Sequence, residues 1–380
     1  MKLSSLYITL ILSAIISACS NSQDQKQSTD STANDSQQSV SLDTNFYKKL
    51  VGTINETINI TMDLVKTDSV FSGSYYYNKI GKPLRLSGHF IEGTNQIELI
   101  EHNELGNKTG TFTGSFDANN NFTGNWVNPE TQKTMPFSLK PANTNNVVSA
   151  TFSHYRNENC RTRDSLLKLA NKENVPYGLD ECSYIDISLI TIETDNKEVS
   201  HKINKTILKD VCHDVGETQY QNVKDYLASI DHLSNEDVYE MDISCSITTN
   251  DKNILSVDVS NSGYTGGAHP NSWVKIYNFD LRNGNEIKLN DFLIEGGEQQ
   301  LASIAEDAFE KAYGKDEWDY EQDKFPLAMN FNISTGGLYF IYNAYEIGSY
   351  AMGAPDVYIP YKDIKHLIKP NSIVAELMNK

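Results

Sequence analysis

The chain has 380 residues, with 32 lysines and arginines against 50 aspartates and glutamates, which gives a formal net charge of −18. Such an acidic surface argues against nucleic-acid binding, and it favours solubility or attraction to cationic partners. At this length we expect two or more domains.

The first residues resemble a secretory signal. An apolar run, Leu6–Ile16, follows a short basic start and is too short for a comfortable transmembrane helix. It leads into Ile-Ser-Ala-Cys, ending at Cys19, which resembles the lipobox of bacterial lipoproteins. In that class the cysteine carries acyl chains such as palmitate, and several chains on one cysteine anchor durably. We therefore expect residues 1–18 to be a lipoprotein signal peptide; the alternative is an ordinary signal peptide beside a chance cysteine.

The same resemblance predicts where the mature protein lies. Ser20 stands where an aspartate would retain a lipoprotein at the inner membrane, so we expect an envelope location at the outer membrane, facing the periplasm or the exterior. Residues 19–44 are mostly Ser, Gln, Asp and Asn, which predicts a disordered tether. Cleavage before Cys19 removes only Lys2 among the charged residues, so the charge becomes −18 − 1 = −19.

Residues 45–141 are dominated by a repeated strand motif in which an apolar residue, a glycine and an aromatic residue are spaced by two. Side chains spaced by two share one face of a strand, and polar turns separate the copies. This pattern predicts a β-rich domain, an antiparallel meander closed into a sandwich or small barrel. We expect the aromatic residues to be core rather than a sugar-binding face. The four copies are Phe71–Tyr75, Leu86–Phe90, Phe112–Phe116 and Phe122–Trp126.

Residues 140–150 are typical of a linker, and the chain beyond them mixes strands with helices. We expect an α+β companion domain over 150–260 and a second α+β domain over 261–380. Within the second, residues 296–314 carry an apolar stripe with helical spacing, ended by a glycine. The predicted fold class is α+β: the meander, followed by antiparallel sheets packed with helices.

Four cysteines besides Cys19 suggest two disulfides, with three possible pairings. Cys212 lies on the apolar face of a predicted helix, and Cys245 lies on the apolar face of a predicted strand. We expect that helix to pack on that strand and to bring these two cysteines together, which leaves Cys160 for Cys182. A zinc site is the alternative, but no pair of cysteines two residues apart supports it, and we predict neither metal nor cofactor.

The stretch Gly-Tyr-Thr-Gly-Gly-Ala-His-Pro-Asn-Ser-Trp, residues 263–273, contains a histidine that invites a catalytic interpretation. The glycine pair before His269 and the proline after it are typical of a tight turn between two strands. A catalytic histidine would need a nucleophile and an orienting carboxylate, and no nucleophile elbow is present. We therefore expect a structural turn histidine that hydrogen-bonds across its loop.

Several stretches of the C-terminal part resemble one bacterial envelope domain family. They are the Gly-Gly-Ala-His turn, the segment Tyr-Asn-Phe-Asp-Leu-Arg-Asn-Gly from 277, the segment Tyr-Glu-Ile-Gly-Ser-Tyr-Ala-Met-Gly from 345, and Ile-Pro-Tyr at 359–361. The family includes the ectodomain of the lysozyme-sensing anti-sigma factor RsiV and the accessory domain of PdaC-type peptidoglycan deacetylases. The resemblance implies an RsiV/PdaC-like domain over 261–380 that binds a cell-wall or protein ligand. Neither an anti-sigma segment nor a deacetylase domain is present here, so those activities do not transfer.

Two groups of residues are candidates for ligand binding. Tyr345, Glu346 and Tyr350 lie close together and, with His269, could contact a glycan; Glu346 could also act as a general acid, although no second carboxylate can be paired with it from sequence. Residues 291–323 hold eleven acidic residues against two lysines, a local charge of −9. This run is either a solvated surface or a docking surface for a cationic protein such as lysozyme, and its candidate residues are Glu306, Glu310, Asp316 and Asp319.

The sequence therefore predicts a non-enzymatic, acyl-anchored envelope lipoprotein that acts as a ligand-binding module, with lysozyme or peptidoglycan as the ligand and no nucleic acid. An enzyme acting on envelope glycans, or a purely structural envelope protein, are the alternatives.

Overall fold

A computed structural model describes residues 44–103, 106–142, 147–162, 180–212, 223–224, 227, 240–264, 268–315, 318 and 324–378. All of them belong to one compact unit, Gln38–Lys380. The predicted signal peptide, Cys19, nearly all of the tether, and the acidic residues Asp316 and Asp319 lie outside the described residues. Within the described part of the chain, no helix is long and apolar enough to cross a membrane.

The N-terminal strands form a closed barrel in which each strand pairs antiparallel with the next and β8 returns to pair with β1. The predicted meander is thus a barrel rather than a sandwich. Its strands are β1 (Phe46–Ile54), β2 (Ile58–Thr67), β3 (Val70–Tyr77), β4 (Leu84–Phe90), β5 (Ile97–His102), β6 (Lys108–Phe116), β7 (Phe122–Val127) and β8 (Thr134–Pro141).

The repeated motif fills the barrel interior, as expected for core aromatic residues. Phe71, Tyr75, Phe112 and Phe122 are fully buried in one apolar cluster. The glycines of the motif let neighbouring strands approach closely: Gly114 and Gly124 lie opposite each other, and a side-chain carbon on Gly124 would come within 2.0 Å of the Thr113 carbonyl oxygen. The glycines thus let the strands come close together, and the aromatic residues of the motif fill the interior that the strands enclose.

One carboxylate lies within this apolar interior. Glu101 on β5 accepts hydrogen bonds from the Tyr75 hydroxyl at 2.6 Å, the Thr109 hydroxyl at 2.6 Å and the Trp126 indole nitrogen at 3.0 Å. A side chain at Gly110 would collide with both the Glu101 carboxylate and the Trp126 ring, at 2.4 and 2.5 Å. Three donors from three positions thus share one acceptor, which fixes how β3, β6 and β7 pack against β5.

The first prediction concerns this acceptor. Glu101→Ala should lower the free energy of unfolding by about 3–5 kcal/mol, because it removes the carboxylate acceptor of the buried Tyr75 and Trp126 groups and of the half-buried Thr109 hydroxyl, and opens a cavity. Chemical denaturation measures the change. Glu98→Ala on the same strand is the matched control and should cost less than about 1 kcal/mol, since Glu98 accepts no such bonds among the described residues. Equal losses in the two variants would contradict the assigned role of Glu101.

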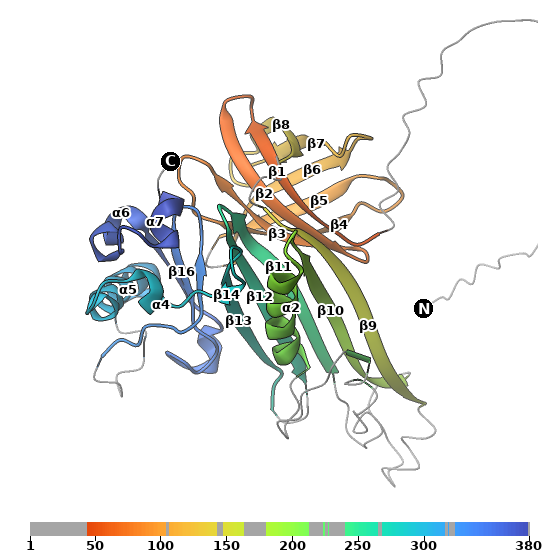
Figure 1. The fold of residues 1–380 in the computed structure, drawn as a ribbon. Helices are drawn as coiled ribbons and strands as arrows, with labels where there is room; N and C mark the ends of the chain where they lie inside the picture. Colours follow the sequence, from red (N-terminus) through yellow and green to blue (C-terminus); the bar gives the residue numbers. More distant parts are fainter. Residues whose placement is uncertain are drawn as a thin grey trace, which may run out of the picture. The chain divides into compact units, whose positions relative to one another are not determined.

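The next strands form a six-stranded sheet in the order β14-β13-β12-β11-β10-β9. Only β10 and β11 pair in parallel. Helix α2 (Lys197–Val211) lies along one face of this sheet, as Figure 1 shows, and buries Ile203 and Ile207 against it. The predicted domain boundary at residue 260 falls inside β12, so both predicted α+β segments contribute to this sheet. The strands are β9 (Ser149–Thr162), β10 (Asp180–Glu193), β11 (Glu240–Asp251), β12 (Ile254–Tyr264), β13 (Asn271–Asp280) and β14 (Asn285–Glu286).

The cysteines on this sheet correct one prediction. Helix α2 does bring Cys212 into the same apolar cluster as Cys245, but both thiols are free and buried. The predicted Cys212–Cys245 disulfide is therefore wrong: sharing a core does not make two sulfurs bond. Burial raises the pKa of each thiol to about 12, which keeps both protonated and unreactive. Cys182 lies directly opposite Cys160 in the β9–β10 register, a spacing that suits a disulfide, and that bond stays a prediction.

The C-terminal part adds a three-stranded antiparallel sheet in the order β15-β16-β17, covered by helices (Figure 1). The predicted long helix is α5 (Gly297–Tyr313); it buries Leu301, Ala305 and Phe309, and it ends at Gly314. The fold class is α+β, as predicted. The remaining elements are α4 (Leu289–Phe292), β15 (Phe331–Ile333), β16 (Gly337–Ile341), η2 (Tyr350–Met352), β17 (Asp356–Pro360), α6 (Tyr361–Ile364), η3 (Lys365–Leu367) and α7 (Ile373–Met378).

Candidate functional site

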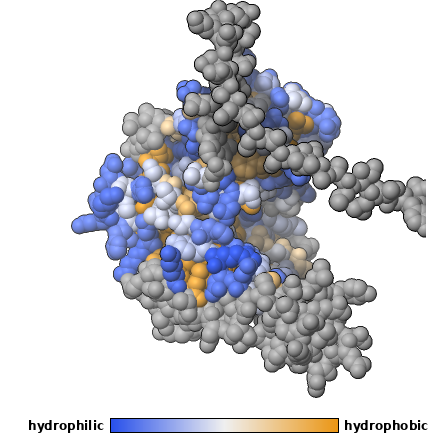
Figure 2. Space-filling view, turned by 90° about the vertical axis from the view of Figure 1, so that its right-hand side faces the viewer, coloured by the Kyte–Doolittle hydropathy of each residue, from blue (hydrophilic) through white to orange (hydrophobic). Residues whose placement is uncertain are grey.

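Exposed apolar groups on the surface could serve as a binding site. On the face shown in Figure 2, hydrophobic residues form small separate spots within a hydrophilic surface. Among the exposed large side chains of the described residues, Tyr345 is 63% exposed and belongs to a group of aromatic rings. Isolated exposed apolar residues are ordinary on protein surfaces, whereas a group of them marks a candidate binding site.

The structure brings together His269, Tyr345 and Tyr350, which we call the aromatic cluster. The His269 and Tyr350 rings stack with centroids 3.9 Å apart, and the Tyr345 and Tyr350 centroids are 5.8 Å apart. Each ring therefore has a ring neighbour, although the two tyrosines are 76 and 81 residues away from the histidine in sequence.

Hydrogen bonds fix the orientation of these rings and the tautomer of the histidine. Nδ1 of His269 lies 2.9 Å from the carbonyl oxygen of Pro270, which can only accept. Nδ1 therefore carries the proton, and in the neutral ring Nε2 accepts from the Tyr345 hydroxyl at 3.2 Å. The Tyr350 hydroxyl donates to the same Pro270 carbonyl at 2.7 Å. His269 thus hydrogen-bonds within its own turn and to a ring across it.

Glu346 has a positioning role beside the cluster. Its two carboxylate oxygens accept from the backbone nitrogen and the side-chain nitrogen of Asn343, at 2.9 and 3.2 Å. These bonds close the turn over residues 343–346 that carries Tyr345. A carboxylate that accepts two local hydrogen bonds suits holding a turn better than donating a proton to a substrate.

Asn343 in turn ties this turn to the six-stranded sheet. Its side chain accepts from the backbone nitrogen of Val274 at 2.7 Å and donates to the Val274 carbonyl at 3.1 Å, as a neighbouring strand would. Asn330 repeats the arrangement, donating to the same carbonyl at 2.8 Å and accepting from the Ile276 nitrogen at 3.3 Å. The edge of β13 is thus satisfied by asparagine amides, and this places residues 343–350 against the turn that holds His269.

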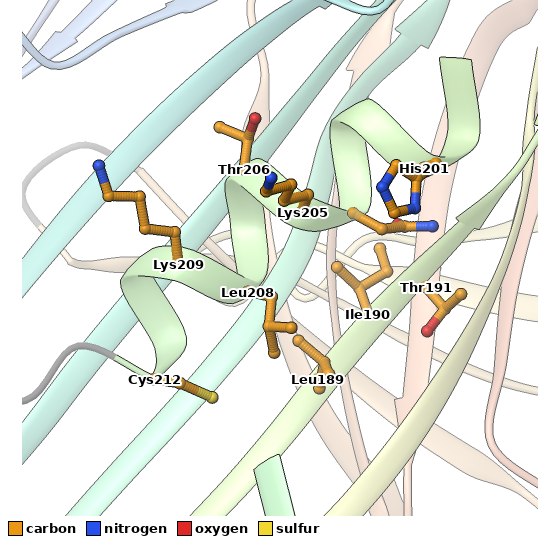
Figure 3. Close-up of a pocket in the computed structure, with 10 residues that line it drawn as sticks. Leu189, Ile190, Thr191, His201, Lys205, Thr206, Leu208, Lys209 and Cys212 are labelled. Atoms are coloured by element: carbon orange, nitrogen blue, oxygen red, sulfur yellow. The ribbon is translucent and has the colours of Figure 1, made fainter. Parts of the chain in front are cut away.

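A second candidate location is a hollow of about 620 Å³ between α2 and β10. Figure 3 shows the α2 side chains His201, Lys205 and Lys209 at its rim, with Leu189 and Ile190 of β10 opposite. The rim is cationic and the floor is apolar. Cys212 also lines it, but burial raises its thiol pKa to about 12, so this sulfur is no nucleophile at neutral pH.

The acidic candidates lie elsewhere. Glu306 and Glu310 are half-buried on α5, and neither makes an ion pair with another described residue. No group of three or more His, Cys, Asp or Glu side chains within the described ranges is arranged to hold a metal ion. The structure therefore joins His269, Tyr345, Glu346 and Tyr350 at one location and leaves the α5 carboxylates as a separate surface.

Sequence reasoning missed the residues that build the cluster. Asn330 and Asn343 look like ordinary loop residues, and nothing in their local sequence shows that their amides bond to a strand more than fifty residues away. The one local signal was the closeness of Asn343 to the Tyr345–Tyr350 stretch, which could have marked it as part of the same turn.

Backbone strain supports a binding role for Tyr345 and leads to the second prediction. Its φ of 70° lies in the left-handed region, which is costly for a bulky residue. Tyr345→Asn should raise the free energy of unfolding by at most about 1 kcal/mol, because asparagine adopts this region more readily, although the exposed hydrogen bond to His269 is lost. Thermal unfolding measures the change. Tyr350→Asn, where φ is not positive, is the control and should give no gain; a loss of stability in Tyr345→Asn would mean that the ring serves the fold.

Comparisons with known proteins bear on the C-terminal half. A family model described as "Protein of unknown function (DUF3298)" matches residues 290–362, and one described as "Deacetylase PdaC" matches residues 179–272. Among curated proteins, none matches this chain.

Two solved structures of DUF3298 family proteins are similar to this chain. A member of the DUF3298 family from Bacteroides fragilis NCTC 9343 is 20% identical, covers 62% of this chain and 100% of its own, and has a TM-score of 0.50. A DUF3298 family protein from Pseudomonas aeruginosa PAO1 is 18% identical over 58% of this chain and 94% of its own, with a TM-score of 0.41. At these identities the first likeness supports the fold and the second carries no further weight. The C-terminal half of this chain therefore fits a domain of the PdaC and RsiV type that includes a DUF3298 segment, a family of unknown function.

Proposed function

We propose that this protein is an acyl-anchored envelope lipoprotein whose C-terminal part binds glycan strands of peptidoglycan through the aromatic cluster, without catalysing a reaction. The anchor rests on the lipobox ending at Cys19. The binding role rests on one observation: an exposed, strained tyrosine held in a pre-oriented group of rings.

The chemistry of the cluster suits a sugar. The apolar faces of sugar rings pack on aromatic faces, while hydroxyl groups at the ring edges take up the hydrogen bonds of the sugar. His269 and the two tyrosines present both kinds of contact. Because hydrogen bonds and stacking already fix the rings, little side-chain freedom is lost when a ligand binds.

The rival function is an enzyme that acts on envelope glycans with Glu346 and His269. Glycoside hydrolysis needs a pair of carboxylates about 5–10 Å apart, one of them a proton donor. Glu346 accepts two hydrogen bonds from Asn343, and Nε2 of His269 accepts from Tyr345. These contacts favour binding over catalysis.

The third prediction tests glycan binding. Tyr345→Ala together with Tyr350→Ala should weaken binding to purified sacculi by roughly tenfold per ring removed, the loss of one ring contact each. Co-sedimentation of the chain from residue 38 onward with sacculi measures it. Tyr184→Ala, on β10 and outside the cluster, is the matched control and should bind normally. Sacculi bound equally by all three proteins would refute the cluster as the site, and turnover of the glycan would favour the enzyme.

A second candidate is a cationic protein such as lysozyme, docking on α5. The observation that favours it is that Glu306, Asp307 and Glu310 lie within one stretch of α5 and make no ion pair with any described residue. Carboxylates left without partners attract a cationic surface and speed encounter.

The fourth prediction separates the two candidates. If α5 docks a cationic protein, affinity for lysozyme should fall between 0.1 and 1 M salt, as the Debye length shrinks from about 10 to about 3 Å. Glu306→Gln with Glu310→Gln should slow association more than it speeds dissociation, measured by surface plasmon resonance. Glu92→Gln with Glu130→Gln removes the same charge from the barrel and should have little effect. Salt-insensitive binding, or none, removes this candidate.

A further inference from the structure

One cavity lies where the three sheets meet. It has a volume of about 180 Å³ and is lined by residues of β3 and β4 from the barrel, β11 and β12 from the six-stranded sheet, and β15 and β16 from the three-stranded sheet. It is separate from the aromatic cluster, none of whose residues lines it.

A guanidinium with unused donors forms part of the wall. Arg85 on β4 uses Nη2 for both of its hydrogen bonds, to Asp356 at 2.5 Å and to the Tyr339 hydroxyl at 3.4 Å. Its Nε and Nη1 atoms make no hydrogen bond to any described residue. The side chain is 52% exposed, so the cavity is open to solvent along this wall.

A carboxylate with few partners forms another part of the wall. Asp258 on β12 accepts one long hydrogen bond, from the Thr248 hydroxyl at 3.3 Å. Burial raises the pKa of Asp258 to about 6, although Arg85 and the Thr248 hydroxyl act in the opposite direction. The carboxyl group is therefore ionised at pH 7 and above, in a place with little compensation for its charge.

The two charges share the cavity but do not neutralise each other directly. No ion pair within 4.0 Å joins Arg85 to Asp258, and the close partner of Arg85 is Asp356 instead. Two opposite charges in the wall of one cavity suit a molecule that carries the complementary charges.

The rest of the wall limits the size and polarity of that molecule. Pro83, Leu86 and Ile341 contribute apolar surface between the charged groups. A water molecule occupies about 30 Å³ in the liquid, so the cavity suits a ligand of roughly six to nine non-hydrogen atoms. Such a ligand would be small, with an apolar part and two ends of opposite charge.

We propose that this cavity binds a small apolar α-amino acid, with its carboxylate on Nη1 of Arg85 and its ammonium group on Asp258. Nη1 of the guanidinium is free to donate a charge-assisted hydrogen bond to that carboxylate. The ammonium group would supply the donors that Asp258 lacks, and a short aliphatic side chain would lie against Leu86 and Ile341.

Calorimetric titration of the chain from residue 38 onward with alanine and valine, at about pH 7.5, tests the proposal. We expect Kd values between about 1 μM and 1 mM, the range open to so small a ligand. Acetate and propylamine each carry one of the two charges and should bind at least about tenfold more weakly, since each leaves one wall charge unpaired. Tryptophan is too large and should not bind.

Variants assign the binding to this cavity. Asp258→Asn should weaken alanine binding at least about tenfold while the protein stays folded, because it removes the charge of a half-buried side chain that has few hydrogen-bond partners. Arg85→Lys keeps the positive charge beside Asp356 but loses the separate Nη1 donor, and should also weaken binding. Asp242→Asn on β11 lies outside the cavity and should bind as the unchanged protein does, as should Tyr345→Ala with Tyr350→Ala.

The outcomes are distinct. Binding of alanine that depends on both Asp258 and Arg85 supports the proposal, whatever the sacculus experiment gives. No binding up to about 10 mM, far above the expected range, would overturn it, as would equal binding by Asp258→Asn. Propylamine or acetate that binds as tightly as alanine would also overturn it, because one charge would then suffice.

Discussion

The C-terminal architecture depends on asparagine amides that take the place of a strand. An amide side chain offers one donor and one acceptor, the same pair that a neighbouring backbone would present to a strand edge. Asn330 and Asn343 bond to the β13 backbone in this way. Buried Asn278 lies on β13 itself, and its side chain bonds in the other direction, to the backbone of Phe331 and Ile333 on β15. Side-chain amides rather than paired backbones join the six-stranded sheet to the three-stranded sheet. The strands of the two sheets therefore need not align as one continuous sheet. The turns at their ends can therefore meet, and the aromatic cluster forms there.

The junction between barrel and sheet is also polar. Asn250, fully buried on β11, donates to the Tyr47 hydroxyl of the barrel and to the Val148 carbonyl. Tyr47 and Lys49 both reach Asp63 inside the same junction. Burial raises the pKa of Asp63, and Lys49 acts against that rise. Such networks add little net stability, but they fix how two bodies fit because each partner left alone would be costly.

Sequence patterns predicted the elements better than the contacts between them. The apolar stripe ended by Gly314 located α5, and the spacing of Phe71 and Tyr75 located the barrel core, because both patterns are set by local geometry. Closure of the barrel by β1 and β8 joins residues more than eighty positions apart, and no periodicity records such pairing. The cysteine prediction shows the same limit: the apolar faces correctly placed Cys212 near Cys245, but only the folded core decides whether two sulfurs bond.

The candidate site shows the same difference between local groups of residues, which the sequence predicts, and long-range contacts, which it does not. Tyr345, Glu346 and Tyr350 were visible as a local group. The glycine pair and the proline predicted a turn at His269, although Gly266 and Gly267 lie outside the described residues. That these two stretches meet depends on Asn343, whose partner Val274 is 69 residues away. The Arg85–Asp356 ion pair spans 271 residues and could not be inferred from either local sequence. Long-range polar contacts carry no repeating signature, because each one depends on the position of a single amide or charge.

The two proposed binding sites differ in which parts of the chain they need. The aromatic cluster is complete within the two matched segments, since His269 lies in 179–272 and both tyrosines lie in 290–362. The cavity needs the barrel as well, because Arg85 lies outside both matches while Asp258 and Tyr339 lie inside them. A domain of this type without the barrel could therefore keep the cluster, but it would lose the guanidinium wall of the cavity. In these proposals the barrel does more than separate the proposed anchor from the proposed binding domain, because it supplies one of the two charges that the cavity presents.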